Sequence, residues 1–473
     1  MYDLIIKNGK LVYDSYTIEN DIAVKDGKIV QIGKFSDEQA SRVVDATGKY
    51  VLPGGVEAHM HCMAPFQGAL GANTFYEQSI SAAFGGVTTF MDFANMSRGQ
   101  SPFEQVKARR KEMEESAIDY SVHGKFIEAN ESTLKDIDKL VEYGTPTFKM
   151  FMTYKKEGVM AEDETILKVF QKCKEVKGLP MLHCESNPIA ENNIRECEEK
   201  NDLSWVNFAK CKPVLCEAEA FSRAVWFAKY VDTGIIVVHT TNKEALDVAR
   251  EAHSKGFPIY VETGPHYLTL FDDLYEREDG YLAICSPPLR TPKQAEELWD
   301  GIKDKTISLI GSDDCTFDVD EKSMFLEKDS DGKFIQDFRK VVNGLSGLEV
   351  RLPIMLSEGV NKGRISINDV VALTSTNIAK VYGCFPQKGI LAVGSDADIV
   401  IVDMEKEVTL NKDLLHNNIS YCLHEGMQIK GYPQMTISHG NIIVEDAKFY
   451  GEKFAGKFVE RSIDKNIIKK FDL

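Results

Sequence analysis

The sequence has no apolar run approaching the roughly 20 residues that a membrane-spanning helix needs, and no CxxC pair among its 10 cysteines. It is also short of positive charge, with 56 Lys and Arg against 73 Asp and Glu and a formal net charge of −17. Nucleic acid and anionic membranes are bound by clustered Lys and Arg, so we expect neither as a partner. The N-terminal stretch MYDLIIKNGKLVYD becomes polar too early for a secretory signal. These absences, with cysteines in no paired framework, favour a reduced, cytoplasmic protein.

The composition is that of a globular protein of more than one domain. Hydrophobic residues make up 43% of the chain and charged residues 27%. At 473 residues the chain is too long for one ordinary core. We therefore expect one large domain and a smaller one.

Both ends of the chain have the pattern of short strands and tight turns. DIAVKDGKIVQIG contains two alternating runs around Asp26-Gly27, which is a strong hairpin signal, and GSDADIVIVDM and ISHGNIIVEDAKF are similar near the other end. We expect residues 1–55 and 385–454 to form one small β-sandwich domain. Residues 455–473 form a charged tail that we expect to wrap a neighbouring molecule or to be mobile.

Between residues 56 and 384, short apolar runs alternate with stretches of helical periodicity. The candidate strands are VEAHMH, VTTFMDFA, YSVHGKFI, TFKMFMT, LPMLHCE, GIIVVHT, PIYVETG and ISLIGSDD. Eight βα units over about 330 residues predict an α/β fold, a (β/α)8 TIM barrel that forms the catalytic domain. A doubly wound open sheet is the alternative.

Polar residues follow several of these strands at the end where TIM barrels carry their working groups. His59 and His61 end the first strand, and residues i and i+2 of a strand point to the same side. His183, His239 and Asp313 end three others. A single histidine at a strand end is more often structural, and an H-x-H pair alone is ambiguous. Four histidines and an aspartate, all at strand ends, together indicate a metal site.

Lys149 lies inside the apolar run TPTFKMFMT, where a free ammonium is costly to bury. One interpretation is a lysine that is ion-paired or extends its amine to solvent. The other is a lysine of lowered pKa that reacts with carbon dioxide, giving a carbamate with two oxygens suited to bridging two divalent ions. The residues alone leave both interpretations open.

Other polar residues near the strand ends have simpler interpretations. His123 has no partner in the sequence pattern, and we expect it to pack. Cys62, Cys184 and Cys315 flank candidate ligands, and we expect them to pack as well because adjacent strand residues diverge. Asp92 ends the second strand, and we expect it to support a histidine ligand.

As an ordered set, several motifs resemble the dihydropyrimidinase and hydantoinase branch of the amidohydrolase superfamily, including its phenylhydantoinases. They are GGVEAHMH, TFKMFMTYK, LHCES, VVHTT, CSPPLR, GSDDCTF and VNGLSGLEVR. The resemblance covers nearly the whole chain, through QKGILAVGSDADIVI. It implies a cyclic amidohydrolase that opens dihydropyrimidines or 5-substituted hydantoins, small cyclic ureides, and it implies a homotetramer.

The resemblance also implies six ligands for two divalent metal ions, usually zinc. They are His59, His61 and Asp313 on the more buried ion, His183 and His239 on the second, and Lys149, carboxylated by CO2, bridging both.

Four residues acquire further roles through the resemblance. Asp313 is implied to take a proton from the attacking water and to deliver it to the departing ring nitrogen. Tyr154, five residues past Lys149, is implied to donate a hydrogen bond to the developing oxyanion, although a loop tyrosine could also simply pack on the surface. Ser286 and Asn343 match positions whose backbone groups bind the cyclic diamide.

Several features depart from the pattern. Asp314 stands where the family more often has histidine, and His183 begins HCES where the family commonly has HAEN. The loop CMAPFQGALGANTF lacks an expected acidic pair, and ETGPHYL around His266 is similar to the related allantoinases. An allantoinase and a non-catalytic scaffold of the same fold are therefore alternatives. Retention of all six ligand positions argues against the scaffold.

Overall fold

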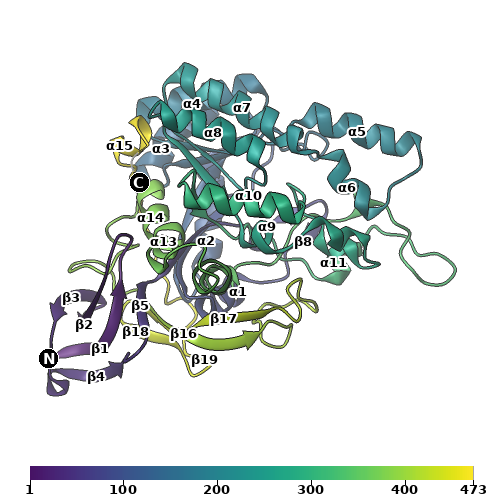
Figure 1. Cartoon of the computed structure of the whole chain (residues 1–473). Helices are drawn as coiled ribbons and strands as arrows, with labels where there is room; N and C mark the ends of the chain where they lie inside the picture. The colour runs from purple at the N-terminus through teal and green to yellow at the C-terminus, as the bar shows by residue number, and fades with distance from the viewer. Residues whose placement is uncertain (472) are drawn as a thin grey trace.

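A barrel of parallel strands is the centre of the computed structural model, which describes residues 1–471 and 473 (Figure 1). Its eight strands run in chain order around one sheet: β6 (Gly55–Met60), β9 (Val87–Phe93), β10 (Asp119–Lys125), β11 (Thr147–Phe151), β12 (Leu179–His183), β13 (Ile235–Val237), β14 (Ile259–Thr263) and β15 (Ile307–Ile310). A parallel bridge between Met60 and Asp314 brings the two edges together. All eight predicted strands are confirmed, and with them the TIM barrel.

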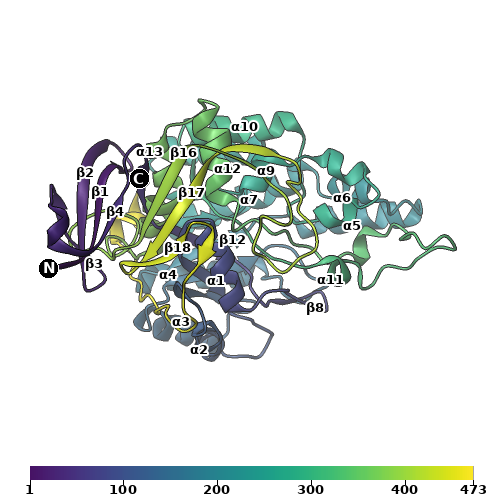
Figure 2. The same cartoon turned by 90° about the horizontal axis from the view of Figure 1, so that it is seen from below.

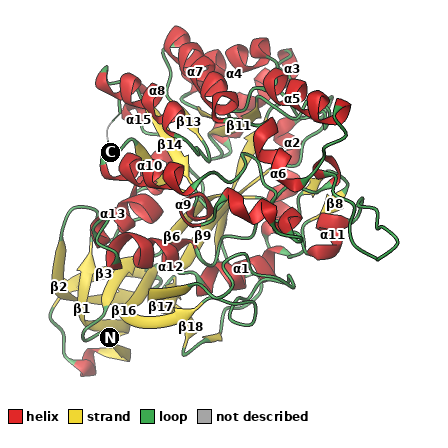
Figure 3. Ribbon diagram, turned by 45° about the vertical axis from the view of Figure 1, so that its right-hand side comes forward, coloured by secondary structure: helices red, strands yellow, loops and turns green. Residues whose placement is uncertain are grey.

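Helices follow most of the strands and cover the outside of the barrel (Figure 3). The longer ones are α1 (Phe75–Phe84), α2 (Pro102–Met113), α3 (Glu131–Glu142), α4 (Asp163–Val176), α5 (Asn187–Glu199), α6 (Trp205–Cys211), α7 (Val214–Val231), α8 (Lys243–Ser254) and α10 (Pro292–Lys303). The shorter ones are α9 (Pro265–Thr269), α11 (Val319–Ser323), α12 (Arg351–Ile354), α13 (Ile367–Val371), α14 (Asn377–Tyr382) and α15 (Lys465–Lys469). Helix α3 shows why these segments are helical: Asn130 caps its N-terminus, and Ile137 and Leu140 are buried on one face.

The two chain ends form a second, mixed sheet beside the barrel (Figures 1 and 2). Its strands are β1 (Tyr2–Val12), β2 (Thr17–Lys25), β3 (Lys28–Gly33), β4 (Ala40–Asp45), β5 (Tyr50–Pro53), β16 (Ile399–Thr409), β17 (Gln428–Ser438), β18 (Asn441–Glu445) and β19 (Lys448–Phe449). The antiparallel pairing of β5 with β16 joins the two ends. The expectation that both ends share one β-structure is confirmed, whereas the boundaries at residues 55, 385 and 455 stay predictions. A minor hairpin, β7 (Pro65–Phe66) with β8 (Ala69–Leu70), lies in the loop after β6.

The predicted hairpin at Asp26-Gly27 is present between β2 and β3. Asp26 has φ 50° and Gly27 has φ 74°. Two successive residues of positive φ are what a two-residue hairpin turn with the right twist requires, which explains the Asp-Gly pair.

The C-terminal tail packs under its own barrel, which corrects the expectation of a mobile or neighbour-wrapping segment. The guanidinium of Arg461 is buried and donates hydrogen bonds to Ser121 Oγ (2.8 Å) and to the carbonyl oxygen of Val122 (2.6 Å) on β10. Ile463 and Ile467 join the apolar cluster inside the barrel. The charged residues of the tail concealed this apolar stripe in the sequence.

The helices of this fold were compared with the length and hydropathy that a membrane-spanning helix requires. Within residues 1–471 and 473, no helix combines the length and the apolar character needed to span a bilayer.

Candidate metal centre and substrate cavity

One cavity at the carboxyl ends of the barrel strands contains every residue that the sequence analysis named as a metal ligand, a catalytic group or a substrate-binding group. It encloses about 800 Å³ of empty space, counting its open mouth. Its lining includes His59, His61, Lys149, Tyr154, His183, His239, Ser286, Asp313 and Asn343. Residues 284 positions apart in the sequence therefore meet at one site, as the barrel topology requires.

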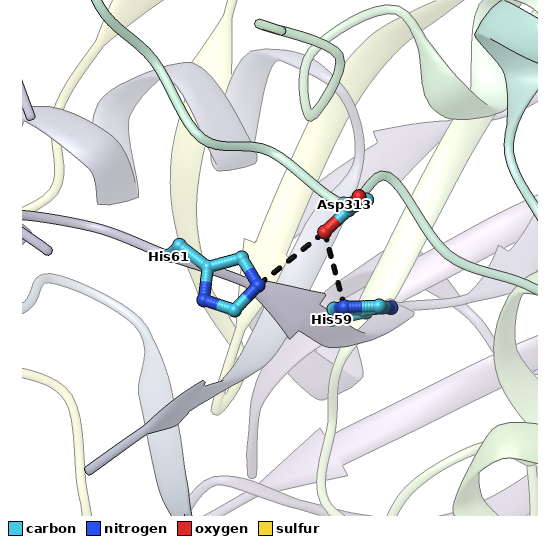
Figure 4. A group of neighbouring side chains, drawn as sticks. All are labelled: His59, His61 and Asp313. Atoms are coloured by element: carbon cyan, nitrogen blue, oxygen red, sulfur yellow. Dashed lines mark ion pairs between the residues drawn. The ribbon is translucent and has the colours of Figure 1, made fainter. Parts of the chain in front are cut away.

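Three of the predicted ligands form a compact group (Figure 4). Oδ1 of Asp313 lies 3.0 Å from Nε2 of His59 and 3.3 Å from Nε2 of His61. Burial alone would raise the pKa of Asp313, but His59 and its hydrogen bond outweigh burial and hold this pKa well below its usual range. Asp313 is thus an anionic oxygen donor beside two imidazole nitrogens, a donor set typical of zinc sites.

Glu262 orients His59. Its Oε1 lies 2.6 Å from Nδ1 of His59, which leaves Nε2 directed at Asp313. A carboxylate on the far nitrogen is the usual support of a metal-binding histidine. The expectation that Asp92 has this role is wrong, because Asp92 pairs with Arg109 (3.1 Å) and accepts a hydrogen bond from the Cys62 amide. The signal for Glu262 was present: an acidic residue within the apolar strand PIYVETG.

His183 and His239 form the second pair of predicted ligands, with ring centroids 4.3 Å apart. Nε2 of His183 lies 2.6 Å from Oε2 of Glu185, so its Nδ1 is left for a ligand. Nδ1 of His239 is buried and has no hydrogen-bond partner in the described part of the chain. Because an orphaned buried nitrogen is costly in a purely structural histidine, this pair fits a metal site better than a packed core.

Lys149 lines the same cavity and interacts electrostatically with histidines of both pairs. Its side chain is fully buried, and Nζ lies 3.4 Å from Nε2 of His59 and 5.1 Å from the ring centroids of both Phe93 and Phe151. No carboxylate of residues 1–471 or 473 lies within ion-pair distance of Nζ. Burial lowers the pKa of Lys149 to about 8. The ion-paired interpretation of Lys149 therefore has no partner to support it.

The backbone at three site residues is strained. Tyr154, His239 and Asp313 have φ values of 65°, 40° and 46°, in the left-handed region that side chains seldom adopt. Such conformations cost on the order of 1–3 kcal/mol each and persist where the surrounding fold imposes them. Here they turn the side chains that follow β11, β13 and β15 into the cavity.

A hydrogen-bonded polar network surrounds Ser286, which lines the cavity with Tyr154 and Asn343. Ser286 Oγ accepts hydrogen bonds from Lys212 Nζ (2.6 Å) and Asn343 Nδ2 (3.1 Å), and Lys212 Nζ also lies 3.1 Å from Glu185. Burial raises the pKa of Tyr154 to about 12, so its hydroxyl remains a donor at neutral pH. The sequence analysis missed Lys212, because it lies between α6 and α7 and follows no strand.

Asp314 and His123 could each be a metal ligand or a structural residue, and their contacts decide between the two. The carboxylate of Asp314 turns away from the cavity and accepts hydrogen bonds from the amides of Gly347 (2.8 Å) and Leu348 (3.0 Å). Both ring nitrogens of His123 are engaged, with Thr147 Oγ1 (2.6 Å) and the carbonyl oxygen of Ala58 (3.0 Å). Both residues are therefore structural.

The cysteines near the ligands divide into two kinds. Cys62 and Cys184 are buried outside the cavity lining, as expected. Cys315 packs against the apolar cluster of Ala69, Phe317 and Val342, as expected, but it also lines the cavity. Cys285, which the sequence did not single out, lines the cavity too.

A second cluster of potential metal ligands lies between the barrel and the terminal sheet, but it already contains a cation. Asp119, Asp396 and His439 gather around the buried Lys388, whose Nζ lies 2.5 Å from Asp119 and 3.0 Å from Asp396. An ammonium in this position neutralises the carboxylates, so the cluster is an internal ion network that joins β10 to the terminal sheet.

The comparisons with known proteins agree with this geometry. The model of the amidohydrolase family matches residues 50–443, which is most of the chain. The chain belongs to the amidohydrolase family. It is 36% identical to a D-hydantoinase of Ralstonia pickettii over 463 residues, covering 97% of this chain and 99% of the relative. It is 35% identical to a D-hydantoinase of Geobacillus stearothermophilus, covering 97% and 96%.

The fold of this chain is also very similar to that of a solved structure. The crystal structure of a dihydropyrimidinase from Brevibacillus agri NCHU1002 superposes with a TM-score of 0.93 at 34% identity, covering all of both chains. The resemblance stated from the motifs is confirmed. The family is metal-dependent, and the cavity of this amidohydrolase holds the matching donor groups.

Proposed function

We propose that this amidohydrolase hydrolyses an amide bond of a cyclic ureide, a dihydropyrimidine or a 5-substituted hydantoin, and so opens the ring. The observation that carries the proposal is the convergence of all six predicted ligand positions in one cavity. Similarity over 97% of the chain to enzymes named D-hydantoinase supports the choice of substrate class.

The donor groups fit two divalent metal ions, for which zinc is our proposal. His59, His61 and Asp313 would hold one ion, and His183 and His239 the other. We propose that Lys149 bridges them as a carbamate, formed when its neutral amine adds to CO2 with loss of one proton. The burial of Lys149 without a carboxylate partner and its place beside His59, in the cavity that both groups line, support this assignment.

The residues of the chain then divide the reaction between them. When bound, two divalent ions would lower the pKa of a water molecule enough to give a hydroxide nucleophile at neutral pH, and would polarise the scissile carbonyl. Asp313 accepts the proton of the attacking water and passes it to the ring nitrogen as the C–N bond breaks. The Tyr154 hydroxyl donates a hydrogen bond to the oxygen that becomes negative. The backbone groups of Ser286 and Asn343 bind the intact ring amide, while Lys212 fixes the Ser286 side chain.

A turnover panel of dihydrouracil, hydantoin, phenylhydantoin and allantoin tests the substrate class. We expect a hydantoin or a dihydropyrimidine to be opened faster than allantoin. A preference for allantoin by an order of magnitude in kcat/KM would favour the allantoinase alternative. Protein that purifies without stoichiometric metal and opens none of the four would favour the scaffold.

We also propose a cytoplasmic homotetramer. All ten cysteines are free, and Sγ of Cys197 lies 3.3 Å from Sγ of Cys211 without a bond, which fits a reducing compartment. Leu215, Trp226 and Tyr230 are exposed on one face of α7, which offers an apolar surface for self-association. Light scattering of the purified protein tests the assembly.

A further inference from the structure

The cavity contains a second lysine beside the candidate bridge. Lys125 ends β10 and lines the cavity, and it is the register partner of Lys149 on β11. Both lysines lie against the ring of Phe151: Nζ of Lys125 is 5.2 Å from the ring centroid, and Nζ of Lys149 is 5.1 Å from it. Lys125 is partly exposed to the cavity whereas Lys149 is fully buried, so Lys125 lies nearer the mouth.

The ammonium of Lys125 has no counter-ion in the described residues. Lys212, a buried lysine that donates a hydrogen bond to Ser286 but does not itself line the cavity, is by contrast paired with Glu185 at 3.1 Å. Lys125 has only the face of Phe151, and burial lowers its pKa to about 8. A cation that remains charged at neutral pH in a partly desolvated cavity without a carboxylate is costly unless a ligand supplies the anion.

Asn95 adds a second polar group at the same place. Asn95 lies two residues beyond Phe93 on β9, as Lys125 lies two residues beyond His123 on β10, and Phe93 and His123 are register partners. Its side chain also lines the cavity and makes no hydrogen bond within residues 1–471 and 473. The register of β9 and β10 thus puts an ammonium and a free amide donor at neighbouring strand ends, and these two donors suit the two oxygens of a carboxylate.

The barrel order places this pair across the cavity from the groups that bind the ring. Ser286 lies in the segment that follows β14, and β14 is four strands from β10 in the eight-stranded order. A ring held at Ser286 and Asn343 would therefore direct a substituent on its far carbon toward Lys125 and Asn95.

We propose that Lys125 and Asn95 form a subsite for a carboxylate, so that the preferred substrate is a cyclic ureide whose ring substituent carries a carboxylate. The inference rests on the proposed ring-opening function and narrows its substrate class. The carbamate of Lys149 is the rival anion for Lys125, and the experiment separates the two.

Hydantoin-5-acetic acid and hydantoin-5-acetamide form a matched pair, because they differ only in the charge and the terminal atom of the substituent. We would measure kcat/KM for both with metal-loaded protein, and metal content alongside. The expected acid-to-amide ratio is at least tenfold for the natural chain. Lys125→Met should bring the ratio to about one or below, and Lys125→Arg should retain the preference for the acid. Lys156→Met is the control: Lys156 is an exposed lysine two residues past Tyr154 and is paired with Glu191, outside the cavity lining, so its loss should leave the ratio unchanged.

Three results would overturn the inference. In the first, the natural chain opens the amide at least as fast as the acid. In the second, Lys125→Met lowers both rates equally together with bound metal, which would make Lys125 a support of the carbamate. In the third, neither probe is opened: if dihydrouracil or phenylhydantoin is still opened, the carboxylate subsite alone fails, and if no cyclic ureide is opened, the proposed function fails with it.

Discussion

Nζ of Lys149 lies 3.4 Å from Nε2 of His59, in the cavity that both groups of candidate metal ligands line. A bridge between two metal ions needs a group that can bind both ions. The free amine of Lys149 has no anionic oxygen for this, whereas its carbamate has two oxygens. The distance is the structural reason for assigning a bridging role to a carboxylated Lys149.

Lys149→Ala should lose both metals and nearly all activity, because it removes the bridge. Bound metal measured by elemental analysis, with turnover of a hydantoin, checks this. Adding a short carboxylic acid should restore part of the activity by supplying the missing oxygens. A variant that keeps two ions per chain and normal turnover would show that the carbamate assignment is wrong.

Asp313→Asn should fold and retain most of its metal, while kcat falls by about 10²–10⁴-fold, the usual scale for losing a general acid–base. Asparagine keeps one coordinating oxygen but cannot take a proton at neutral pH. Asp314→Asn is the matched control, since the Asp314 carboxylate is directed at the Gly347 and Leu348 amides. An active Asp313→Asn beside a crippled, well-folded Asp314→Asn would reverse the assignment.

Glu262→Gln should weaken metal binding by about 10–100-fold without unfolding the barrel, because His59 loses the carboxylate that orients it. Competition with a zinc chelator measures the affinity. Glu251→Gln, on exposed α8, is the control and should match the natural chain. Equal zinc affinity in both variants would mean that Glu262 does not support the site.

Arg461→Met should destabilise the barrel by about 1–3 kcal/mol for each buried acceptor that it leaves without a donor. The buried acceptors are Ser121 Oγ, Thr147 Oγ1 and the carbonyl oxygens of Val122 and Tyr382. Urea unfolding followed by circular dichroism gives the change, with exposed Arg277→Met as the control. If Arg461→Met leaves the free energy of unfolding unchanged, the tail does not unfold cooperatively with the barrel and the account of the tail is wrong.

The sequence was informative where a physical pattern repeats locally. Eight apolar runs with polar ends predicted the barrel strands, and the same ends placed His59 and Asp313 in one cavity, because parallel strands bring their carboxyl ends together. The hairpin at Asp26-Gly27 followed from turn chemistry alone.

The sequence was less informative where partners meet only after folding. Lys212 lies in a helix connection, yet its side chain hydrogen-bonds Ser286, 74 residues further along the sequence. Asp92 and Glu262 both belong to barrel strands, and only the packing of Arg109 against Asp92 assigns the histidine support to Glu262. The tail hid its apolar contacts among charged residues, because Ile463 and Ile467 are too few for a visible periodicity.

The most direct test of the account is a metal titration of chelator-treated protein, following hydrolysis of phenylhydantoin or dihydrouracil. Zinc should restore ring opening, with activity reaching its maximum near two ions per chain in the presence of bicarbonate as a source of CO2. Full ring-opening activity in metal-free protein, or no activity on any cyclic ureide after loading with two ions per chain, would contradict it.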